Sequence, residues 1–569
     1  MYRVNMPPCQ VACPSDTNIS KYIRLILEGD LYEAWKVNRV ANVFPSICGR
    51  VCVHYCEGEC KRQNLNPRVG PYVSTKPVAI RGLKRFITDN LTPDYVKRFL
   101  DETLPIKKNN KNVAVIGAGP AGLTVANDLI LSGCEVEVFE ALPEPGGMLR
   151  VGIPSYRLPT EVLMEEIDLL KKLGIKIRLN SALGRDVTLE GLRKDFDAVC
   201  VAIGAHKPML LMIKGEQLEG IFPGIDFLRK LSLGEDVDVK GKTVAVVGGG
   251  FTAADAARCA LRQGANTFVL YRRGKEEMPM DEEEKEALVE ENIPIHYLTA
   301  PIEVISNDGK KAAKLRCVKM ELEEIEETDS QKDRRRRPVP IPDSEFEIEA
   351  DIVLPAIAQK PDLSNFPEDF KINPDDFSTS MEGVYAGGDF LYGATTDVIK
   401  AIGQAHKASI RILQFLGQKP KSPDIPQKKK RNRSPWCFED TQRLRREKVY
   451  GGWLDSSKEA YEEVEEGMSQ ELAAYESSRC LQCDFFIELK NDETCHRCGN
   501  CVASCPQGAL EMVRKEVPVP PGQPDAWFNS GHWRTDETSK VLIKPELCIQ
   551  CGTCVLICPN KCISFVYRE

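Results

Sequence analysis

The sequence lacks any run of 18 apolar residues, and its start lacks the basic-then-apolar pattern of a secretory signal. A helix needs about 20 mainly apolar residues to cross a bilayer, and a signal peptide needs an apolar core behind a basic start. Both absences predict a soluble, cytoplasmic protein without a membrane span. An excess of positive charge is missing as well, because the formal net charge is −8. This balance argues against nucleic acid as the main partner.

Two basic runs, 334–337 and 428–431, stand out against the acidic balance, and we interpret both as solvated loops rather than docking patches. Cysteine, in contrast, is abundant, with 22 residues. Disulfides are rare in a reducing compartment, so the cysteine spacing points to metal binding. With 569 residues the chain is long enough for roughly four domains.

A dinucleotide-binding pattern follows the first hundred residues. An apolar, β-branched run (113–116) leads into the glycine turn 117–122, a helical pattern (123–131) and a second strand (135–139) that ends in Glu140. A GxGxxG motif indicates a nucleotide when strand, helix, second strand and acidic residue surround it in this way.

Each glycine of this turn has a separate role. Gly117 permits the tight turn, Gly119 lets the backbone approach a diphosphate, and Gly122 lets helix and strand pack closely. The diphosphate binds at the helix N-terminus, where unpaired N–H groups favour negative charge. Glu140 is expected to accept hydrogen bonds from the adenosine ribose. We assign this site to FAD.

The fingerprint recurs in a second unit. A strand (243–247) leads into the turn 248–253, a helix (254–263) and a strand (267–270) that ends in Tyr271-Arg272-Arg273. Arginine in place of the acidic residue can clamp a 2′-phosphate, so we assign this site to NADPH. The alternative is that both arginines are ordinary surface charges. The expected contacts are Gly248, Gly250, Ala253, Arg272 and Arg273.

Further flavin contacts are expected outside the first fingerprint. The loop 146–159 should reach the flavin, and a strand at 196–203 should return to the FAD sheet. That sheet should resume with strands at 350–354 and 383–389, and the helix 398–416 should direct its N-terminus at the flavin pyrimidine. The predicted contacts are Gly147, Met148, Leu149, Arg157, Gly388, Asp389, Ala394, Thr395 and Thr396. No paired cysteines lie beside the flavin loop, which excludes a disulfide reductase.

The C-terminal cysteines form two copies of C-x2-C-x2-C-x3-C-P. This spacing is the bacterial ferredoxin run, in which three cysteines bind one [4Fe–4S] cluster and the fourth binds the other. Zinc is the competing metal, but four-cysteine zinc sites do not use this interlocked spacing. The eight ligands are Cys495, Cys498, Cys501, Cys505, Cys548, Cys551, Cys554 and Cys558.

Two further cysteine groups lie outside the ferredoxin runs. The N-terminal group contributes six cysteines, two short of two four-ligand clusters, and an isolated CxxC contributes two more. Together with the ferredoxin ligands they make sixteen, enough for four [4Fe–4S] clusters. These eight cysteines are Cys9, Cys13, Cys48, Cys52, Cys56, Cys60, Cys480 and Cys483.

The expected class is α/β, with two Rossmann-like nucleotide-binding domains between two iron–sulfur domains. The domains are a helical iron–sulfur domain (1–105), an FAD domain in two parts (106–235 and 351–417) around an NADP domain (236–350), a linker and helix returning the CxxC (418–490) and a ferredoxin domain (491–569).

These motifs resemble the small (β) subunit of NADPH-dependent glutamate synthase and its relatives. The relatives include the N-terminal half of dihydropyrimidine dehydrogenase and the large subunit of the ferredoxin-dependent NADPH transhydrogenase. The resemblance implies FAD at the first fingerprint, NADPH at the second and two [4Fe–4S] clusters in the helical domain. It rests on residues 48–60, 117–122, 146–159, 248–253, 271–279 and 383–396, within residues 1–416.

The chain departs from this family in three respects. The leading CxxC pair of the relatives is displaced to Cys480 and Cys483, and a ferredoxin domain is appended. Lys84 stands where relatives use a Glu or Gln as a cluster ligand, and Cys48 is the natural replacement. The expected ligand sets are Cys9, Cys60, Cys480 and Cys483 for one cluster, and Cys13, Cys48, Cys52 and Cys56 for the other.

This cofactor set predicts an NADPH-dependent oxidoreductase subunit that converts hydride transfer into single-electron transfer. NADPH and a partner redox subunit or ferredoxin are the expected partners, in a hetero-oligomer. One alternative is the glutamate synthase small subunit itself, and another is a redox sensor or scaffold without turnover. Two intact nucleotide fingerprints argue against the sensor, which needs only one redox group.

Overall fold

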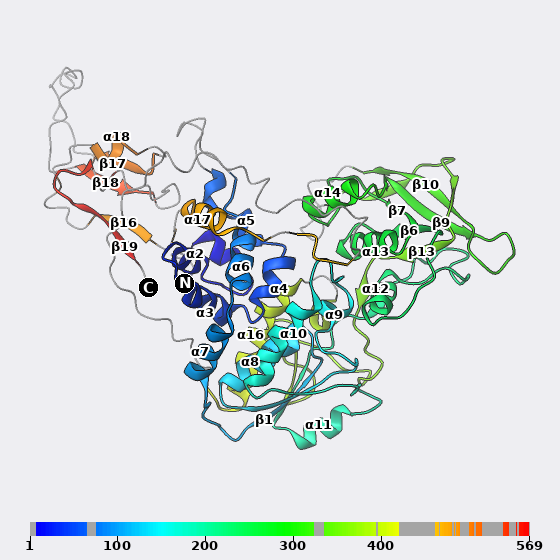
Figure 1. The fold of residues 1–569 in the computed structure, drawn as a ribbon, viewed down its shortest axis with the longest axis horizontal. Helices are drawn as coiled ribbons and strands as arrows, with labels where there is room; N and C mark the ends of the chain where they lie inside the picture. The colour runs from blue at the N-terminus through cyan, green and yellow to red at the C-terminus, as the bar shows by residue number, and fades with distance from the viewer. Residues whose placement is uncertain are drawn as a thin grey trace, which may run out of the picture.

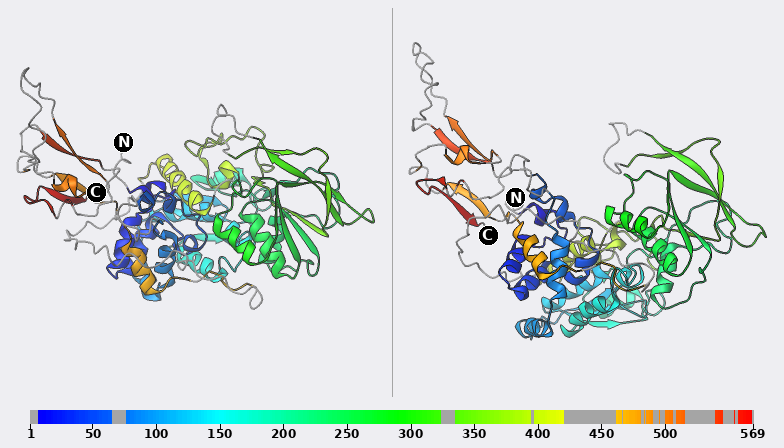
Figure 2. Two further views of the ribbon diagram at one scale, coloured as in Figure 1. Left: turned by 90° about the horizontal axis from the view of Figure 1, so that it is seen from above. Right: turned by 45° about the horizontal axis from the view of Figure 1, so that its top comes forward.

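The computed structural model describes residues 7–64, 76–323, 335–393, 397–419, 461–465, 467–480, 483, 485–489, 495, 500–505, 508–514, 539–544, 554 and 557–567. The molecule is elongated (Figure 1). Its N-terminal helical domain lies between the C-terminal strands on one side and the nucleotide-binding domains on the other, and the additional views in Figure 2 show the same order.

Short helices build the N-terminal domain. Several begin at a side-chain cap: Asn18, Asp30 and Thr92 each accept a hydrogen bond from a backbone N–H of the first turn. Buried aromatic side chains such as Trp35 and Phe44 fill the core. The helices are α1 (Pro8–Ala12), α2 (Ile19–Leu27), α3 (Leu31–Ala41), α4 (Pro45–Val51), α5 (Tyr55–Gly58), η2 (Lys61–Asn64), α6 (Ile80–Asp89) and α7 (Pro93–Thr103).

The FAD domain contains a parallel five-stranded sheet in the order β15-β4-β1-β2-β3. Helices α8 and α16 pack against each other beside it. The pairing of β4 and β15 with this sheet confirms the strands predicted at 196–203 and 383–389. The elements are β1 (Asn112–Ile116), α8 (Pro120–Leu131), β2 (Glu135–Phe139), α9 (Met148–Val151), α10 (Thr160–Lys172), β3 (Lys176–Arg178), α11 (Leu189–Asp195), β4 (Ala198–Val201), β15 (Val384–Ala386), α15 (Asp389–Tyr392) and α16 (Val398–Phe415).

The NADP domain repeats this design with a parallel sheet in the order β13-β6-β7-β8, and an antiparallel sheet of β9 to β12 lies beside it. Its elements are α12 (Gly224–Ser232), β6 (Thr243–Val247), α13 (Phe251–Arg262), β7 (Asn266–Tyr271), α14 (Glu282–Glu290), β8 (Ile295–Tyr297), β9 (Thr299–Ile305), β10 (Lys314–Leu322), β11 (Pro338–Pro340), β12 (Phe346–Glu349) and β13 (Ile352–Pro355).

The strand predicted at 350–354 belongs to the NADP sheet, so its assignment to the FAD sheet was wrong. Ile352 pairs with Val244 and Leu354 with Val246 in a parallel register. Phe227 of α12 joins the same hydrophobic core, which extends this domain before residue 236. An all-apolar strand fits either buried sheet, and only the long-range pairing decides between them. The chain crosses between the domains at the two-stranded ladder of β5 (Lys207–Pro208) and β14 (Gln359–Lys360).

The C-terminal part contains two antiparallel pairs. Strand β16 (Phe485–Leu489) pairs with β19 (Ile563–Tyr567), and β17 (Leu510–Arg514) pairs with β18 (Ser539–Ile543). They follow α17 (Gln470–Ser478), and α18 (Asn500–Ala503) lies between β16 and β17 in the sequence. Among the described residues, no helix is long and apolar enough to cross a membrane.

Candidate cofactor sites

The first glycine turn has the close backbone contacts that its spacing predicts. Gly117 has a φ of +105°, and a Cβ atom there would lie 2.4 Å from the Ala202 carbonyl oxygen. A Cβ atom on Gly122 would lie 2.0 Å from the Gly117 oxygen. Gly119 is the N-cap of α8, and no side chain caps this helix. The first N–H groups of α8 are therefore left to bind an anion such as a diphosphate.

The flavin loop crosses directly over this turn. Gly147 has a φ of +55°, and a Cβ atom there would lie 2.8 Å from the Gly119 Cα atom. Met148 and Leu149 follow it as the first residues of α9, and Leu149 is buried. Two glycines are needed here because only bare backbone fits between the segments.

Glu140 ends β2 beside the glycine turn. Its carboxylate accepts hydrogen bonds from the Ala118 N–H (2.6 Å) and the Leu142 N–H (2.9 Å). Burial raises the pKa of Glu140, and these N–H groups oppose that rise. A carboxylate has about four acceptor positions, so the residue retains capacity for a ribose hydroxyl.

The opposite wall of the FAD site is the β15–α15 turn. Gly388 has a φ of +66°, and a Cβ atom there would lie 2.7 Å from the Ala121 Cβ atom on α8. Asp389 begins α15 directly after it. The predicted contacts Ala394, Thr395 and Thr396 lie outside the described residues. Bare helix ends and glycine-lined approaches fit FAD.

The NADP turn repeats this geometry. A Cβ atom on Gly248 would lie 2.3 Å from the Ala356 oxygen and 3.3 Å from the Ala253 Cβ atom. Gly250 is the N-cap of α13, which has no side-chain cap. Helices α8 and α13 therefore both begin at a glycine N-cap, and the N–H groups of their first turns can bind the diphosphate of a dinucleotide.

Arginines gather at the end of β7. Arg272 is exposed, and its pKa is lowered by partial burial and by the neighbouring charges of Arg273 and Arg335. Arg273 Nε donates to the Arg336 carbonyl oxygen at 2.9 Å. The basic run expected to be a solvated loop therefore contributes charge beside the predicted 2′-phosphate site.

Arg157, predicted to contact the flavin, binds two carboxylates of the NADP domain. Its Nη1 lies 2.9 Å from Asp255 Oδ2, and its Nη2 lies 2.8 Å from Glu284 Oε1. The guanidinium thus joins the FAD domain to α13 and α14. Contact between Arg157 and the flavin stays a prediction.

The thiols of the first expected cluster set lie together. The pKa of Cys9 is raised by burial and then by the nearby thiols of Cys483, Cys480, Cys56 and Cys60. Residues 9 and 480 are far apart in sequence, and α17 joins them by packing against α2 and α6. Soft thiolate ligands in such a group fit an iron–sulfur cluster.

The second expected set surrounds Lys84. Burial would raise the pKa of Cys13, but Lys84 and the hydroxyls of Ser15 and Thr17 together lower it. Burial raises the pKa of the thiols of the other three members, and the charge of Lys84 opposes that rise; these members are Cys48, Cys52 and Cys56. Burial would lower the pKa of Lys84 itself, yet the thiols raise it. Cys56 neighbours both sets, so the two groups are adjacent.

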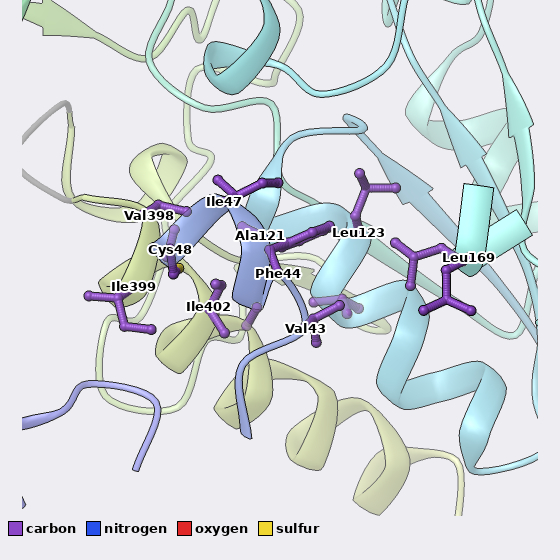
Figure 3. Close-up of a cluster of buried hydrophobic side chains, with 14 of the residues drawn as sticks. Val43, Phe44, Ile47, Cys48, Ala121, Leu123, Leu169, Val398, Ile399 and Ile402 are labelled. Carbon is purple, nitrogen blue, oxygen red and sulfur yellow. The ribbon is translucent and has the colours of Figure 1, made fainter. Parts of the chain in front are cut away.

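The helix that carries Cys48 packs directly on the FAD domain. Figure 3 shows Cys48 beside Val398, Ile399 and Ile402 of α16, with Ala121 of α8 nearby. The Tyr55 hydroxyl donates to Asp397 Oδ2 at 2.6 Å, and Asp397 caps the N-terminus of α16. The second thiol group therefore lies against both helices expected to contact FAD.

Some C-terminal ligand candidates lie in a small core. Cys501 and Cys554 are buried with Leu510, Val541 and Ile563, and Cys495 and Cys505 pack against that core. Cys558 Sγ accepts a hydrogen bond from the Cys562 N–H at 3.3 Å. Burial raises the pKa of Cys558, but backbone donors outweigh it and lower the pKa. Cys498, Cys548 and Cys551 lie outside the described residues.

One other group has the composition of a metal site. Ligand atoms of His54, Asp281 and Glu283 lie within 4.8 Å of one another. Arg81 Nη2 lies 3.0 Å from Glu283 Oε2, so an arginine already provides the positive charge. We interpret the group as an ion-pair contact between the helical and NADP domains.

Residues 461–465 were missed by sequence reasoning. Glu463 accepts a hydrogen bond from Arg50 Nε at 2.8 Å, and the Val464 N–H donates to the backbone carbonyl oxygen of Tyr156 at 2.9 Å. No local pattern could have indicated these contacts, because the partners are more than 300 residues apart.

Comparison with known families matches three parts of the chain. Residues 111–409 match the pyridine nucleotide-disulphide oxidoreductase family, and residues 2–95 match dihydropyrimidine dehydrogenase domain II, described as a 4Fe-4S cluster domain. Residues 494–564 match the 4Fe-4S dicluster domain. These matches confirm the expected fold class: nucleotide-binding domains between two iron–sulfur domains.

Several characterised proteins are similar over most of the chain. The β subunit of the NADPH-Fe(3+) oxidoreductase of Geobacter sulfurreducens is 36% identical over 84% of this chain and 75% of its own length. The small chain of the glutamate synthase [NADPH] of Escherichia coli is 32% identical over 72% of this chain and 89% of its own length.

A third relative is longer than the matched region. The β subunit of the NADP(+)-dependent formate dehydrogenase of Moorella thermoacetica is 38% identical over 74% of this chain, which spans 61% of that subunit.

Proposed function

The chain belongs to the pyridine nucleotide-disulphide oxidoreductase family, with the glutamate synthase small chain among its relatives, and from this we propose that it is an electron-transferring subunit of an NADPH-dependent oxidoreductase. It exchanges hydride between NADPH and FAD and relays single electrons through iron–sulfur clusters. The electrons go to, or come from, a partner subunit or a ferredoxin.

The packing of α4 on α8 and α16 carries this proposal. Cys48 lies against Val398 and Ile402 of α16, and the Tyr55 hydroxyl reaches the cap of the same helix. The thiols therefore adjoin the helix ends that would hold FAD. Bound FAD supplies the conversion between two-electron hydride transfer and the single electrons that clusters accept.

In this mechanism the protein binds and orients the nucleotides and the clusters. The α8 N-terminus at Gly119 and the α13 N-terminus at Gly250 would hold the two diphosphates. Arg272 and Arg273 would bind the 2′-phosphate of NADPH. The thiols would hold four clusters, in the sets given above, and no side chain has to act as a general acid or base.

Anaerobic stopped-flow spectroscopy tests the activity. NADPH should bleach the flavin absorbance of the reconstituted protein within one turnover, and cluster absorbance should then fall. A redox sensor or scaffold without turnover would leave the flavin oxidised, which would refute the proposal.

The choice of NADPH over NADH has its own test. Replacing Arg272 and Arg273 with Ala should lower the affinity for NADPH by roughly ten- to a hundred-fold, since a charged contact contributes about 1.5–3 kcal/mol. NADH affinity should change little. Arg185→Ala is the control, because this arginine of the FAD domain has a side chain that is 70% exposed and pairs with the adjacent Asp186. Equal kinetics with both nucleotides in the unmodified protein would contradict the assignment.

The relatives are named as β subunits or small chains, which supports a hetero-oligomer. We propose a partner subunit that holds the terminal acceptor or donor site. Co-purification under anaerobic conditions should recover this subunit, whereas a chain purified alone with full ferredoxin-reducing activity would contradict an obligate complex.

A further inference from the structure

Residues 461–465, which we name the interdomain strap, lie where three domains meet. Tyr461 and Val464 of the strap contact the two nucleotide-binding domains. The Tyr461 hydroxyl accepts a hydrogen bond from Nε2 of Gln263, the C-cap of α13, at 2.7 Å. The backbone carbonyl oxygen of Tyr461 accepts from the Ser155 hydroxyl at 3.3 Å. The Val464 N–H donates to the backbone carbonyl oxygen of Tyr156 at 2.9 Å, and the Val464 side chain is buried.

Glu463 and Glu465, which alternate with these residues along the strap, form ion pairs with the helical iron–sulfur domain. Glu463 Oε1 lies 2.8 Å from Arg50 Nε and 3.0 Å from Arg85 Nη2. Glu465 Oε1 lies 3.2 Å from Arg81 Nη2. All three arginine side chains are nearly buried, at 6–7% exposure. Each also pairs with a second carboxylate, which is Asp89 for Arg50 and Arg85 and Glu283 for Arg81, so a strap carboxylate that moves away removes one ion-pair partner from a buried charge.

The strap covers a buried contact between the FAD and NADP domains. In this contact Arg157 binds Asp255 and Glu284, as described above. The Tyr156 ring packs under the Arg262 guanidinium at 4.1 Å and is fully buried. Residues 155–157 therefore contact both the NADP domain and the strap.

The covalent connection between these two domains is slender by comparison. The chain crosses at β5 and β14, which form only two residue pairs, Gln359 with Pro208 and Lys360 with Lys207. A short two-strand connection can act as a hinge between domains. The relative orientation of the domains therefore depends on contacts outside this connection, which include the Arg157 ion pairs, the packing of α12 on α9 and the strap.

We propose that the interdomain strap is a positioning element that holds the NADP domain in one orientation for hydride transfer to the flavin. The inference rests on the proposed function, because it assumes that NADPH and FAD occupy the two glycine turns. A misplacement of about 1 Å can slow a reaction on the order of a hundred-fold. Contacts that fix a hinged domain therefore act on the rate rather than on nucleotide affinity.

The test compares strap variants with a matched control in the cofactor-loaded full-length chain. The variants are Tyr461→Phe and the double change Glu463→Gln with Glu465→Gln. Glu471→Gln is the control, since Glu471 is an exposed glutamate in the first turn of α17. Each protein is assayed for flavin reduction by NADPH, for NADP+ affinity, and for amide hydrogen exchange at residues 155–157 and 461–465.

The double variant should reduce its flavin about ten-fold or more slowly at saturating NADPH. Its NADP+ affinity should stay unchanged, and exchange at 155–157 should accelerate; Tyr461→Phe should show a smaller effect of the same kind. A flavin reduction rate equal to that of the control would overturn the proposal. If the unmodified protein shows no reduction by NADPH, the proposed function fails, and hydrogen exchange alone decides: unchanged protection at 155–157 then rejects the strap.

Discussion

At the scale of single residues, Lys84 has an unusual environment. It is only 5% exposed, and its charge acts on the four thiols of the second expected cluster set. Backbone packing places it there: a Cβ atom on Gly49, next to Cys48, would lie 2.8 Å from the Arg85 Cα atom. Net charge around a cluster is one determinant of its reduction potential.

Replacing Lys84 with Met should lower the potential of one cluster, because a reduced cluster loses a nearby positive charge. A unit charge a few ångströms away in a partly polar interior corresponds to a shift on the order of 100 mV. An EPR-monitored redox titration would measure it. Lys21→Met is the control, a buried lysine of the same domain whose neighbouring charges are Arg24, Glu33 and Lys36. Equal shifts in both variants would contradict a local effect.

His406 joins α16 to two other elements. Its Nδ1 lies 2.7 Å from Asp128 Oδ2 on α8, and its Nε2 lies 3.0 Å from the Ala41 oxygen at the end of α3. Both ring nitrogens face acceptors, so the ring donates twice only as imidazolium. Burial would lower the pKa of His406, but Asp128 and Ala41 raise it overall.

The contribution of His406 to stability should therefore depend on pH. Because the pKa of His406 is raised in the folded state, its contribution to the stability of the fold is fully present below about pH 6.5, the ordinary histidine pKa. This contribution is lost as the pH rises through the folded-state pKa. His406→Gln should cost about 1.5–3 kcal/mol at pH 6, and less at high pH. Thermal unfolding of both proteins across this range would measure the difference. A constant difference would contradict the charged state.

At the scale of elements, α17 connects the two ends of the chain. Its buried Glu476 accepts from the Ala79 N–H at 3.1 Å, and Arg479 Nη2 donates to the Lys76 oxygen at 2.7 Å. Arg62 Nη1 donates to the Arg479 oxygen at 2.9 Å. These buried bonds dock the helix on the N-terminal domain and bring Cys480 beside Cys9.

Changing Cys480 and Cys483 together to Ser should remove one cluster, about four iron, because two thiolate ligands are lost. The EPR signals of the ferredoxin pair should remain, and electron transfer from flavin to that pair should slow. Cys134→Ser is the control, since this FAD-domain thiol contacts Asn109 and belongs to no ligand set. Full iron content in the double variant, or loss of a ferredoxin signal, would contradict the ligand assignment.

At the scale of the whole molecule, the domains lie in a sequence suited to electron relay. The NADP and FAD domains adjoin through Arg157, α4 places Cys48 against the FAD domain, and the C-terminal strands lie beyond the helical domain (Figure 1). The two N-terminal thiol groups are thus between the flavin site and the ferredoxin unit.

Anaerobically prepared protein should contain about sixteen iron and sixteen acid-labile sulfur atoms, since the sixteen thiols suffice for four clusters. Colorimetric iron and sulfide assays would measure both. A count near eight would mean that the N-terminal groups hold no clusters and that electrons do not pass through them.

Short-range sequence patterns were enough to predict the local sites of this protein. Glycine turns such as 117–122 and 248–253 are recognisable because their φ angles and close approaches are imposed within a few residues. Ferredoxin runs are recognisable for the same reason, since three of the four cysteines in each run bind one cluster at a fixed short spacing. These features also sufficed to predict the fold class.

The way in which these parts are joined depends on long-range packing that sequence patterns do not show. Strand 352–355 is apolar throughout, so its sequence is compatible with either sheet, and pairing with β6 placed it in the NADP domain. The partners of Arg157 and Glu463 are about a hundred or several hundred residues away. Such contacts depend on how whole domains pack, and no short-range pattern encodes them.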